Sequence, residues 1–166
     1  MSSSLGSDLT YVKSGCSDTI DGVAVNAERR LIGPHLPMGG GLLKAAVRAE
    51  AIGATAVQVF TDNPTAWHRR AGPPAELDAF REHLERAGVE TISVHAPYLV
   101  NLCGANDDFW HRSVATMANE MRVASAYGAR FVVMHIGSHR DLERGVGISR
   151  LVAGLTAVLG QAAVLG

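Results

Sequence analysis

Residues 91–102 read TISVHAPYLVNL, and this stretch carries the clearest indication of the fold. Its first four residues form an apolar run of the length and type of a buried strand, and Pro97 lacks the N–H that a continuing strand would need. His95 is therefore expected where a strand gives way to a loop, at the carboxyl end of that strand.

The same pattern returns downstream in residues 131–139, FVVMHIGSH. A second apolar run, over 131–134, leads directly into His135. Parallel strands end at the same edge of a sheet, and ligands gather there. Two strands that each deliver an imidazole at this end predict one shared mouth lined with metal ligands.

Apolar runs and amphipathic stretches alternate through the rest of the chain. Strands are expected over 31–33, 56–60, 91–94 and 131–134, and helices over 42–52, 73–87, 106–127 and 148–163. The last helix is expected to bury six apolar side chains: Ile148, Leu151, Val152, Leu155, Val158 and Leu159. Four βα units in succession indicate an α/β fold with a parallel sheet covered by helices.

Length and composition describe one soluble domain of ordinary size. The chain has 166 residues, of which 47% are hydrophobic, and its formal net charge of −1 neither favours nor excludes nucleic acid. No apolar segment approaches the roughly 20 residues that cross a bilayer, so no membrane contact is expected. Residues 1–30 lack a secretory pattern and are expected to form a poorly ordered leader before a domain over 31–166. The two cysteines give no disulfide framework, which makes the cytoplasm the expected location.

Each of the four expected units places a polar side chain at the carboxyl end of its strand. The four residues are His35, Asn63, His95 and His135. A lone histidine at such a place is more often structural, but the recurrence of His95 and His135 within matching motifs favours ligands. For the other two the alternatives stay open: His35 binds substrate or only closes its strand, and Asn63 belongs to the site or only caps a turn.

Three stretches of the sequence resemble, in order and spacing, the endonuclease IV family of zinc-dependent apurinic/apyrimidinic endonucleases. They are IGPHLPMGGGLLKAAVRAEAIGATAVQVFTDNPTAW, VHAPYLVNL and HIGSH. The resemblance implies a (β/α) barrel of TIM type, of which this chain supplies about four of the eight βα units, a partial barrel. It also implies a DNA repair hydrolase that cuts the backbone on the 5′ side of an abasic site and leaves a 3′ hydroxyl.

The resemblance assigns roles to particular residues. His95 and His135 become catalytic zinc ligands within a cluster of up to three zinc ions. Zinc suits such chemistry because it lowers the pKa of bound water to about 7 and stabilises charge on phosphate oxygens.

Double-stranded DNA with abasic sites is the implied partner. His35 and Asn63 would line the mouth, while Tyr98 and Leu99 would belong to a loop that pushes into the damaged duplex. A half-buried core position is the equal alternative for Tyr98. Arg69 and Arg70 are expected to face phosphates, although Thr65 stands where many relatives carry a basic residue.

The sequence also departs from the family in one large respect, since four of the eight units and their carboxylate ligands are not in it. We therefore expect a fragment with impaired activity, whose open sheet edges invite self-association; a dimer of two half-barrels is the alternative. Two other functions remain: a sugar isomerase or epimerase on the related xylose isomerase-like barrel, and a non-catalytic half-barrel that binds metal or DNA.

Overall fold

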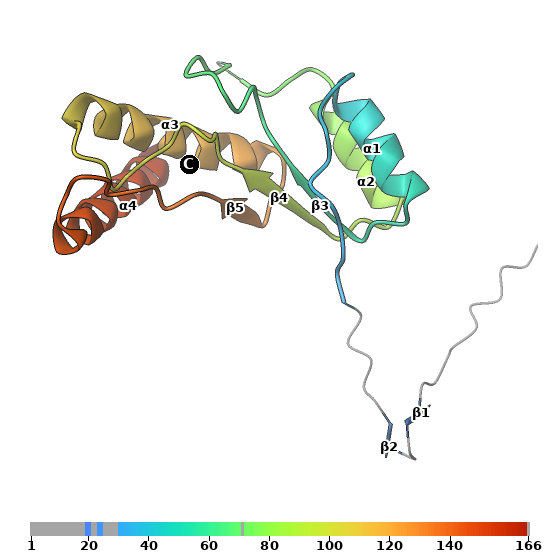
Figure 1. Cartoon of the computed structure of the whole chain (residues 1–166). Helices are drawn as coiled ribbons and strands as arrows, with labels where there is room; N and C mark the ends of the chain where they lie inside the picture. The colour runs from blue at the N-terminus through green and yellow to red at the C-terminus, as the bar shows by residue number, and fades with distance from the viewer. Residues whose placement is uncertain (1–18, 21–22, 25–29, 71, 166) are drawn as a thin grey trace, which may run out of the picture. The chain divides into compact units, whose positions relative to one another are not determined.

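The computed structural model describes residues 19–20, 23–24, 30–70 and 72–165 (Figure 1). The chain divides into two units, Met1–Arg30 and Leu31–Gly166. In the first unit β1 (Thr19–Ile20) pairs antiparallel with β2 (Val23–Ala24). Apart from Arg30, the rest of the expected leader lies outside the described residues.

The second unit is built on a parallel sheet of three strands in the order β3-β4-β5. These are β3 (Ala56–Val59), β4 (Thr91–His95) and β5 (Phe131–Val133). The register pairs Gln58 with Ser93 and Ser93 with Phe131. The expected parallel sheet is therefore confirmed, and β5 ends one residue earlier than expected.

The expected strand over 31–33 is replaced by an extended segment, residues 31–36, that lies along β3. Only His35 forms a bridge in this segment, with Gln58, although the carbonyls of Ile32 and Pro34 accept hydrogen bonds from the β3 side. Proline has no N–H to donate, which interrupts a regular ladder. A Cβ on Gly33 would overlap the carbonyl of Ala56, so this close approach requires glycine.

Four helices alternate with these strands: α1 (Leu42–Ala51), α2 (Leu77–Arg86), α3 (Asp107–Ala126) and α4 (Arg144–Leu165). Helices α1 and α2 pack together beside β3, and α3 and α4 pack together at the β5 end of the sheet (Figure 1). The expectation that Pro73–Pro74 opens a helix is wrong. The Leu77 N–H closes a turn on the Pro74 carbonyl, and α2 begins only after that turn.

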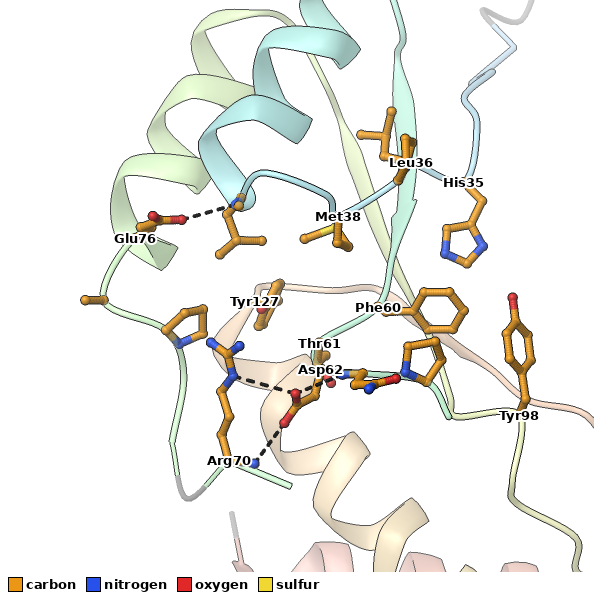
Figure 2. Close-up of a pocket in the computed structure, with 17 residues that line it drawn as sticks. His35, Leu36, Met38, Phe60, Thr61, Asp62, Arg70, Glu76, Tyr98 and Tyr127 are labelled. Atoms are coloured by element: carbon orange, nitrogen blue, oxygen red, sulfur yellow. Dashed lines mark hydrogen bonds and ion pairs between the residues drawn. The ribbon is translucent and has the colours of Figure 1, made fainter. Parts of the chain in front are cut away.

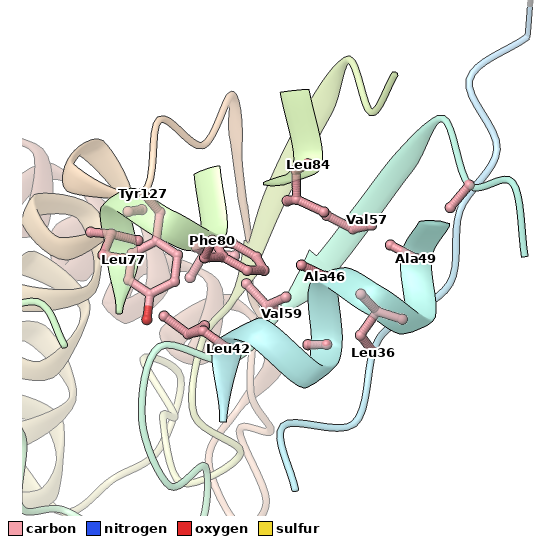
Figure 3. Packing of buried hydrophobic residues seen from close by; sticks show 14 of the residues in the cluster. Leu36, Leu42, Ala46, Ala49, Val57, Val59, Leu77, Phe80, Leu84 and Tyr127 are labelled. Carbon is pink, nitrogen blue, oxygen red and sulfur yellow. The ribbon is translucent and has the colours of Figure 1, made fainter. Parts of the chain in front are cut away.

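The core has two parts. One lies between α1, α2 and the outer face of β3, where Phe80 and Tyr127 meet edge to face with ring centroids 6.2 Å apart (Figure 3). The other joins α3 and α4 to the loop after β4 through Leu102, Met117 and Val158. Apolar side chains at alternate strand positions explain the first part, because Val57 and Val59 point to the helices.

Helix α4 differs from the expected helix in its first residue and in its burial. It begins at Arg144, four residues earlier than expected. By length and composition alone it is long and apolar enough to cross a membrane. Of its six apolar side chains expected to be buried, Val158 is buried and Leu151 partly buried. The other four are 36% to 58% exposed: Ile148, Val152, Leu155 and Leu159. The apolar pattern covers two faces of the helix, and the described chain covers only one.

Candidate functional site

Three imidazoles form a row at the carboxyl ends of neighbouring strands. His35 is the last residue but one of the extended segment, His95 is the last residue of β4, and His135 follows β5 by two residues. The ring centroids of His35 and His95 are 5.5 Å apart, and those of His95 and His135 are 5.2 Å apart. The parallel register thus brings together the histidines that the sequence places in separate units.

The hydrogen bond of His95 leaves one ring nitrogen for a ligand. Its Nδ1 lies 2.6 Å from the carbonyl oxygen of Ala96. A carbonyl only accepts, so Nδ1 carries the proton and Nε2 keeps its lone pair. Burial, with a further contribution from His95, lowers the pKa of His35. The lowered pKa favours the neutral imidazole of His35, the form that binds metals.

The donor type fits zinc, but the number of donors does not. Among the described residues no group of three or more His, Cys, Asp or Glu side chains is placed to hold a metal ion. The carboxylate of Asp62 is already engaged by the backbone N–H groups of Asn63 and Arg70. Burial raises the pKa of Asp62, but these hydrogen bonds and the nearby arginines outweigh it and hold the pKa below its ordinary value.

Two hollows flank Tyr98, one on each side. A pocket of about 870 Å³ is lined by His35, Asp62 and Arg70 (Figure 2). A second hollow of about 730 Å³ is lined by Leu99, His135 and residues that follow β5. The Tyr98 side chain lines both and is 54% exposed, so the half-buried position that was the alternative to a role in DNA binding stays open for this residue.

The ring of Tyr98 packs against neighbouring aromatic rings beside the histidines. Its ring meets Phe60 at 5.2 Å and His95 at 5.6 Å, in edge-to-face geometry in both cases. Its backbone N–H donates to the carbonyl of Pro64 at 3.0 Å. The loop after β4 is therefore tied to the loop after β3.

The loop over residues 61–70 is folded on itself. The Asn63 Oδ1 accepts hydrogen bonds from both the N–H and the hydroxyl of Thr65, which is the turn-capping arrangement. Trp67 packs against Phe109, and the guanidinium of Arg112 lies 4.5 Å from its ring centroid. Asn63 thus has a structural contact, and its role toward a ligand stays a prediction.

The two arginines of this loop point in different directions. The Arg69 side chain is 9% exposed; its Nε lies 3.5 Å from Glu120 Oε1, and its Nη1 donates to the carbonyl of Asn63 at 2.9 Å. Arg70 is 53% exposed beside Asp62. Arg70 is therefore accessible at the surface beside its partner Asp62, whereas Arg69 is held inside by Glu120. DNA contact by either arginine stays a prediction.

Glu120 is the residue that the sequence analysis missed. It lies on the buried face of α3, 1% exposed, and its Oε2 accepts a hydrogen bond from the Thr61 hydroxyl at 2.6 Å. Burial raises the pKa of Glu120 despite the Thr61 hydrogen bond and the charge of Arg69. The signal was available, because Glu120 follows the buried Met117 by three positions and precedes Ala124 by four.

Asn101 was also missed, and it holds the loop that carries His135. Its Nδ2 donates to the carbonyl of Ser138, and its Oδ1 accepts from the N–H groups of Cys103 and Ser138. Gly137 has a φ of 94°, and a Cβ there would overlap the Asn101 side chain. Asn101, from the motif that contains His95, therefore fixes the conformation of the loop that follows His135.

Comparison with known proteins agrees with this fold. The family model described as xylose isomerase-like TIM barrel matches residues 46–166. Endonuclease 4 of Thermus thermophilus is 43% identical over 110 residues, which are 65% of this chain and 40% of that protein. Probable endonuclease 4 of Halothermothrix orenii is 30% identical over 130 residues, 78% of this chain and 47% of that protein. The chain thus spans just under half the length of these relatives.

Solved structures of related proteins are also similar to this chain. The crystal structure of endonuclease IV from Thermus thermophilus superimposes with a TM-score of 0.67 at 38% identity, covering 79% of this chain and 46% of that one. D-psicose 3-epimerase, solved in the presence of D-fructose, gives a TM-score of 0.59 at 11% identity, over 81% of this chain and 49% of that one. At that identity the second likeness concerns the fold alone.

Proposed function

We propose a function from one premise: the chain belongs to the xylose isomerase-like TIM barrel family and, within it, to the endonuclease IV proteins. The function is DNA repair. In this proposal the chain forms the part of a zinc-dependent endonuclease that grips an abasic site in double-stranded DNA, and hydrolysis occurs on the 5′ side of that site. We also propose that the chain acts in the cytoplasm.

The observation that carries the proposal is the row of imidazoles at the strand ends. His95 and His135, 5.2 Å apart between ring centroids, are the proposed zinc ligands, with His35 beside them. Zinc, up to three ions in a complete site, supplies Lewis-acid assistance to phosphodiester hydrolysis. The chain's own part is to hold imidazole nitrogens in place, and the hydrogen bond between His95 and the Ala96 carbonyl supports this by fixing the orientation of the His95 ring.

The surface around this row suits a distorted duplex. Tyr98 projects between two hollows, with Leu99 lining one of them, and an exposed aromatic ring of this kind can occupy the space of a missing base. Arg70 lies at the rim of the larger hollow, where a guanidinium can meet a phosphate oxygen. His35 and Asn63 line the same hollow and are proposed to contact the DNA backbone.

A binding and cleavage experiment tests the proposal. Zinc-loaded chain is titrated into a duplex with one tetrahydrofuran abasic analogue and into the same duplex without it. We expect tighter binding of the abasic duplex, and slow scission on the 5′ side of the analogue that leaves a 3′ hydroxyl. Scission is expected to be slow because the described ligand set is incomplete.

Two variants and one control make the test specific. His135→Ala is expected to abolish scission, and Tyr98→Ala to remove most of the preference for the abasic duplex. His83→Ala is the matched control, since His83 pairs with Glu50 on the helix layer, away from the imidazole row. Equal affinity for both duplexes together with no scission would overturn the proposal.

The two rival functions predict different results. A sugar isomerase or epimerase would bind neither duplex and would convert a ketose, but no observation on this chain beyond its fold favours that activity. A non-catalytic half-barrel would bind DNA or metal with no scission. The scission assay with His135→Ala therefore separates the three.

A further inference from the structure

The larger hollow ends, away from the imidazole row, in a second group of polar side chains. Figure 2 shows Glu76 and Tyr127 on the side of the hollow opposite His35 and Tyr98. Glu76 directly precedes α2, and Tyr127 directly follows α3. Leu42, at the beginning of α1, lines the hollow with them and shares a buried core cluster with Tyr127. This inner end, formed by Leu42, Glu76 and Tyr127, therefore lies where three helices meet and not at a sheet edge.

The Tyr127 hydroxyl is a polar group in a buried position without a protein partner. Tyr127 is 1% exposed and lines the hollow. Its backbone N–H donates to the Val123 carbonyl, but its hydroxyl makes no hydrogen bond with any residue that the structure describes. Burial raises the pKa of Tyr127 to about 12, so the hydroxyl keeps its proton at neutral pH and can donate as well as accept. Buried hydroxyls normally have a partner, and one that lacks a partner beside a hollow indicates a ligand.

The Glu76 carboxylate has one oxygen engaged and one available. Its Oε2 accepts a hydrogen bond at 3.1 Å from the N–H of Leu42, the first residue of α1. Gly41, the N-cap of α1, has no side chain that could satisfy this N–H, so Glu76 caps the helix from outside. The Oε1 atom has no hydrogen-bond partner among the described residues and can accept from a ligand N–H.

The rest of the lining limits the charge and shape of a ligand. Two carboxylates, of Asp62 and Glu76, and one guanidinium, of Arg70, are the charged groups around the hollow, and the pKa of His35 is lowered by burial. An anionic group is therefore unfavourable inside, whereas the 53% exposed Arg70 can meet one at the rim. Between the two ends lie the apolar side chains of Leu36, Met38 and Phe60. The hollow suits a flat, neutral group with N–H donors on one edge.

We propose that the inner end binds a nucleobase with an exocyclic amino group beside a ring nitrogen, the pattern of adenine and cytosine. The amino group donates to Glu76 Oε1, and the ring nitrogen accepts from the Tyr127 hydroxyl. The faces of the base lie against the apolar lining, and the phosphate of the nucleotide meets Arg70 at the rim. Thymine presents a carbonyl and an N–H at the same edge, the reverse pattern, so it fits less well. The hollow, about 870 Å³, is of the size that holds such ligands.

A sugar is the rival neutral ligand. Hydroxyl groups surround a sugar, and several of them would lie against apolar side chains without a partner, which is costly. A nucleobase has its polar groups along its edges and apolar faces between them, which matches a lining with few polar atoms at one end. The inference needs neither zinc nor strand scission, because Glu76 and Tyr127 are not part of the imidazole row.

Titration calorimetry of the full chain with a chelator present tests the proposal. We expect dAMP and dCMP to bind more tightly than dTMP. Tyr127→Phe should weaken the binding of dAMP about three- to tenfold, the effect of one lost hydrogen bond, without lowering the free energy of unfolding, since the hydroxyl has no protein partner to lose.

Glu76→Gln should change the preference and not only the affinity. The amide can keep its oxygen on the Leu42 N–H and present its NH₂ group to the ligand, so dTMP should gain relative to dAMP. Glu85→Gln is the matched control, because Glu85 is an exposed carboxylate on the same helix and does not line the hollow. It should leave both affinities unchanged.

Oligonucleotides distinguish the two sources of such a base. Tighter binding of oligodeoxyadenylate than of oligothymidylate, weakened by Tyr127→Phe, would assign the site to an unpaired base of a DNA strand; binding of dAMP alone would assign it to a free nucleotide. Equal affinity for dAMP and dTMP, affinity for dAMP that Tyr127→Phe leaves unchanged, absence of nucleotide binding, or tighter binding of D-fructose than of any nucleotide would each overturn the proposal.

Discussion

Arg69→Met removes one partner of a buried ion pair and leaves the other without compensation. The side chains of Arg69 and Glu120 are 9% and 1% exposed, and Arg69 Nε lies 3.5 Å from Glu120 Oε1. Solvent therefore screens this pair very little. Removing one member of such a pair destabilises a protein by about 3–5 kcal/mol, because the remaining charge stays buried. We expect a loss of that size in the free energy of unfolding at pH 7.5, measured by urea titration with circular dichroism.

The loss has a pH signature of known sign. Burial already raises the pKa of Glu120, and loss of Arg69 raises it further. A carboxyl whose pKa is higher in the folded than in the unfolded state favours folding at low pH, and this contribution disappears as pH rises through the folded pKa. The destabilisation by Arg69→Met should therefore be smaller at pH 5 than at pH 7.5.

Two further variants complete the test. Adding Glu120→Gln to Arg69→Met should recover most of the lost stability and remove the pH dependence, because no charge is then buried and the Thr61 hydroxyl keeps an acceptor. Arg70→Met is the matched control; Arg70 is 53% exposed and pairs with Asp62 at 3.8 Å, so its loss should be below about 1 kcal/mol. Equal, small losses for Arg69→Met and Arg70→Met would refute the reasoning.

Three other perturbations are predicted. Gly33→Ala should lower the free energy of unfolding by about 2 kcal/mol or more, since the added Cβ would displace the extended segment from β3 and break its hydrogen bonds. The control Gly39→Ala, at a position with open space around it, should cause no such loss in the same urea titration. Phe80→Ala should lower it by about 3–5 kcal/mol, because Phe80 is fully buried, and a loss below about 1 kcal/mol would contradict the packing. Cys103 should react with iodoacetamide at pH 8 far more slowly in the native than in the urea-unfolded chain, because burial raises the pKa of its thiol; equal rates would contradict this.

The repeat of the histidine motif was enough to predict where His95 and His135 meet. Short apolar runs indicate the strands, and strands in a parallel sheet have their carboxyl ends at one edge, so the relation between the two imidazoles follows from sequence alone. The same reasoning placed His35 beside them, although its segment is extended and not a regular strand.

The contacts that shape the loops were not predictable in the same way. The burial of Arg69 depends on Glu120, which lies 51 positions further on and reaches the loop only because α3 packs beneath it. In helix α4 the apolar pattern predicted six buried side chains, and four of them are exposed. An apolar side chain is buried only where another surface packs against it. Sequence periodicity states which faces are apolar and not what covers them.

Zinc uptake measured after dialysis tests the central claim most directly, namely that imidazoles from adjacent strands form one metal-binding mouth. The chain should bind zinc weakly, since its described ligand set is incomplete, and His95→Ala and His135→Ala should each lose this zinc to the same extent as the double variant, because the ligands act on one ion. The control His83→Ala should retain it. If the double variant keeps as much zinc as the unmodified chain, the imidazole row is not a metal site.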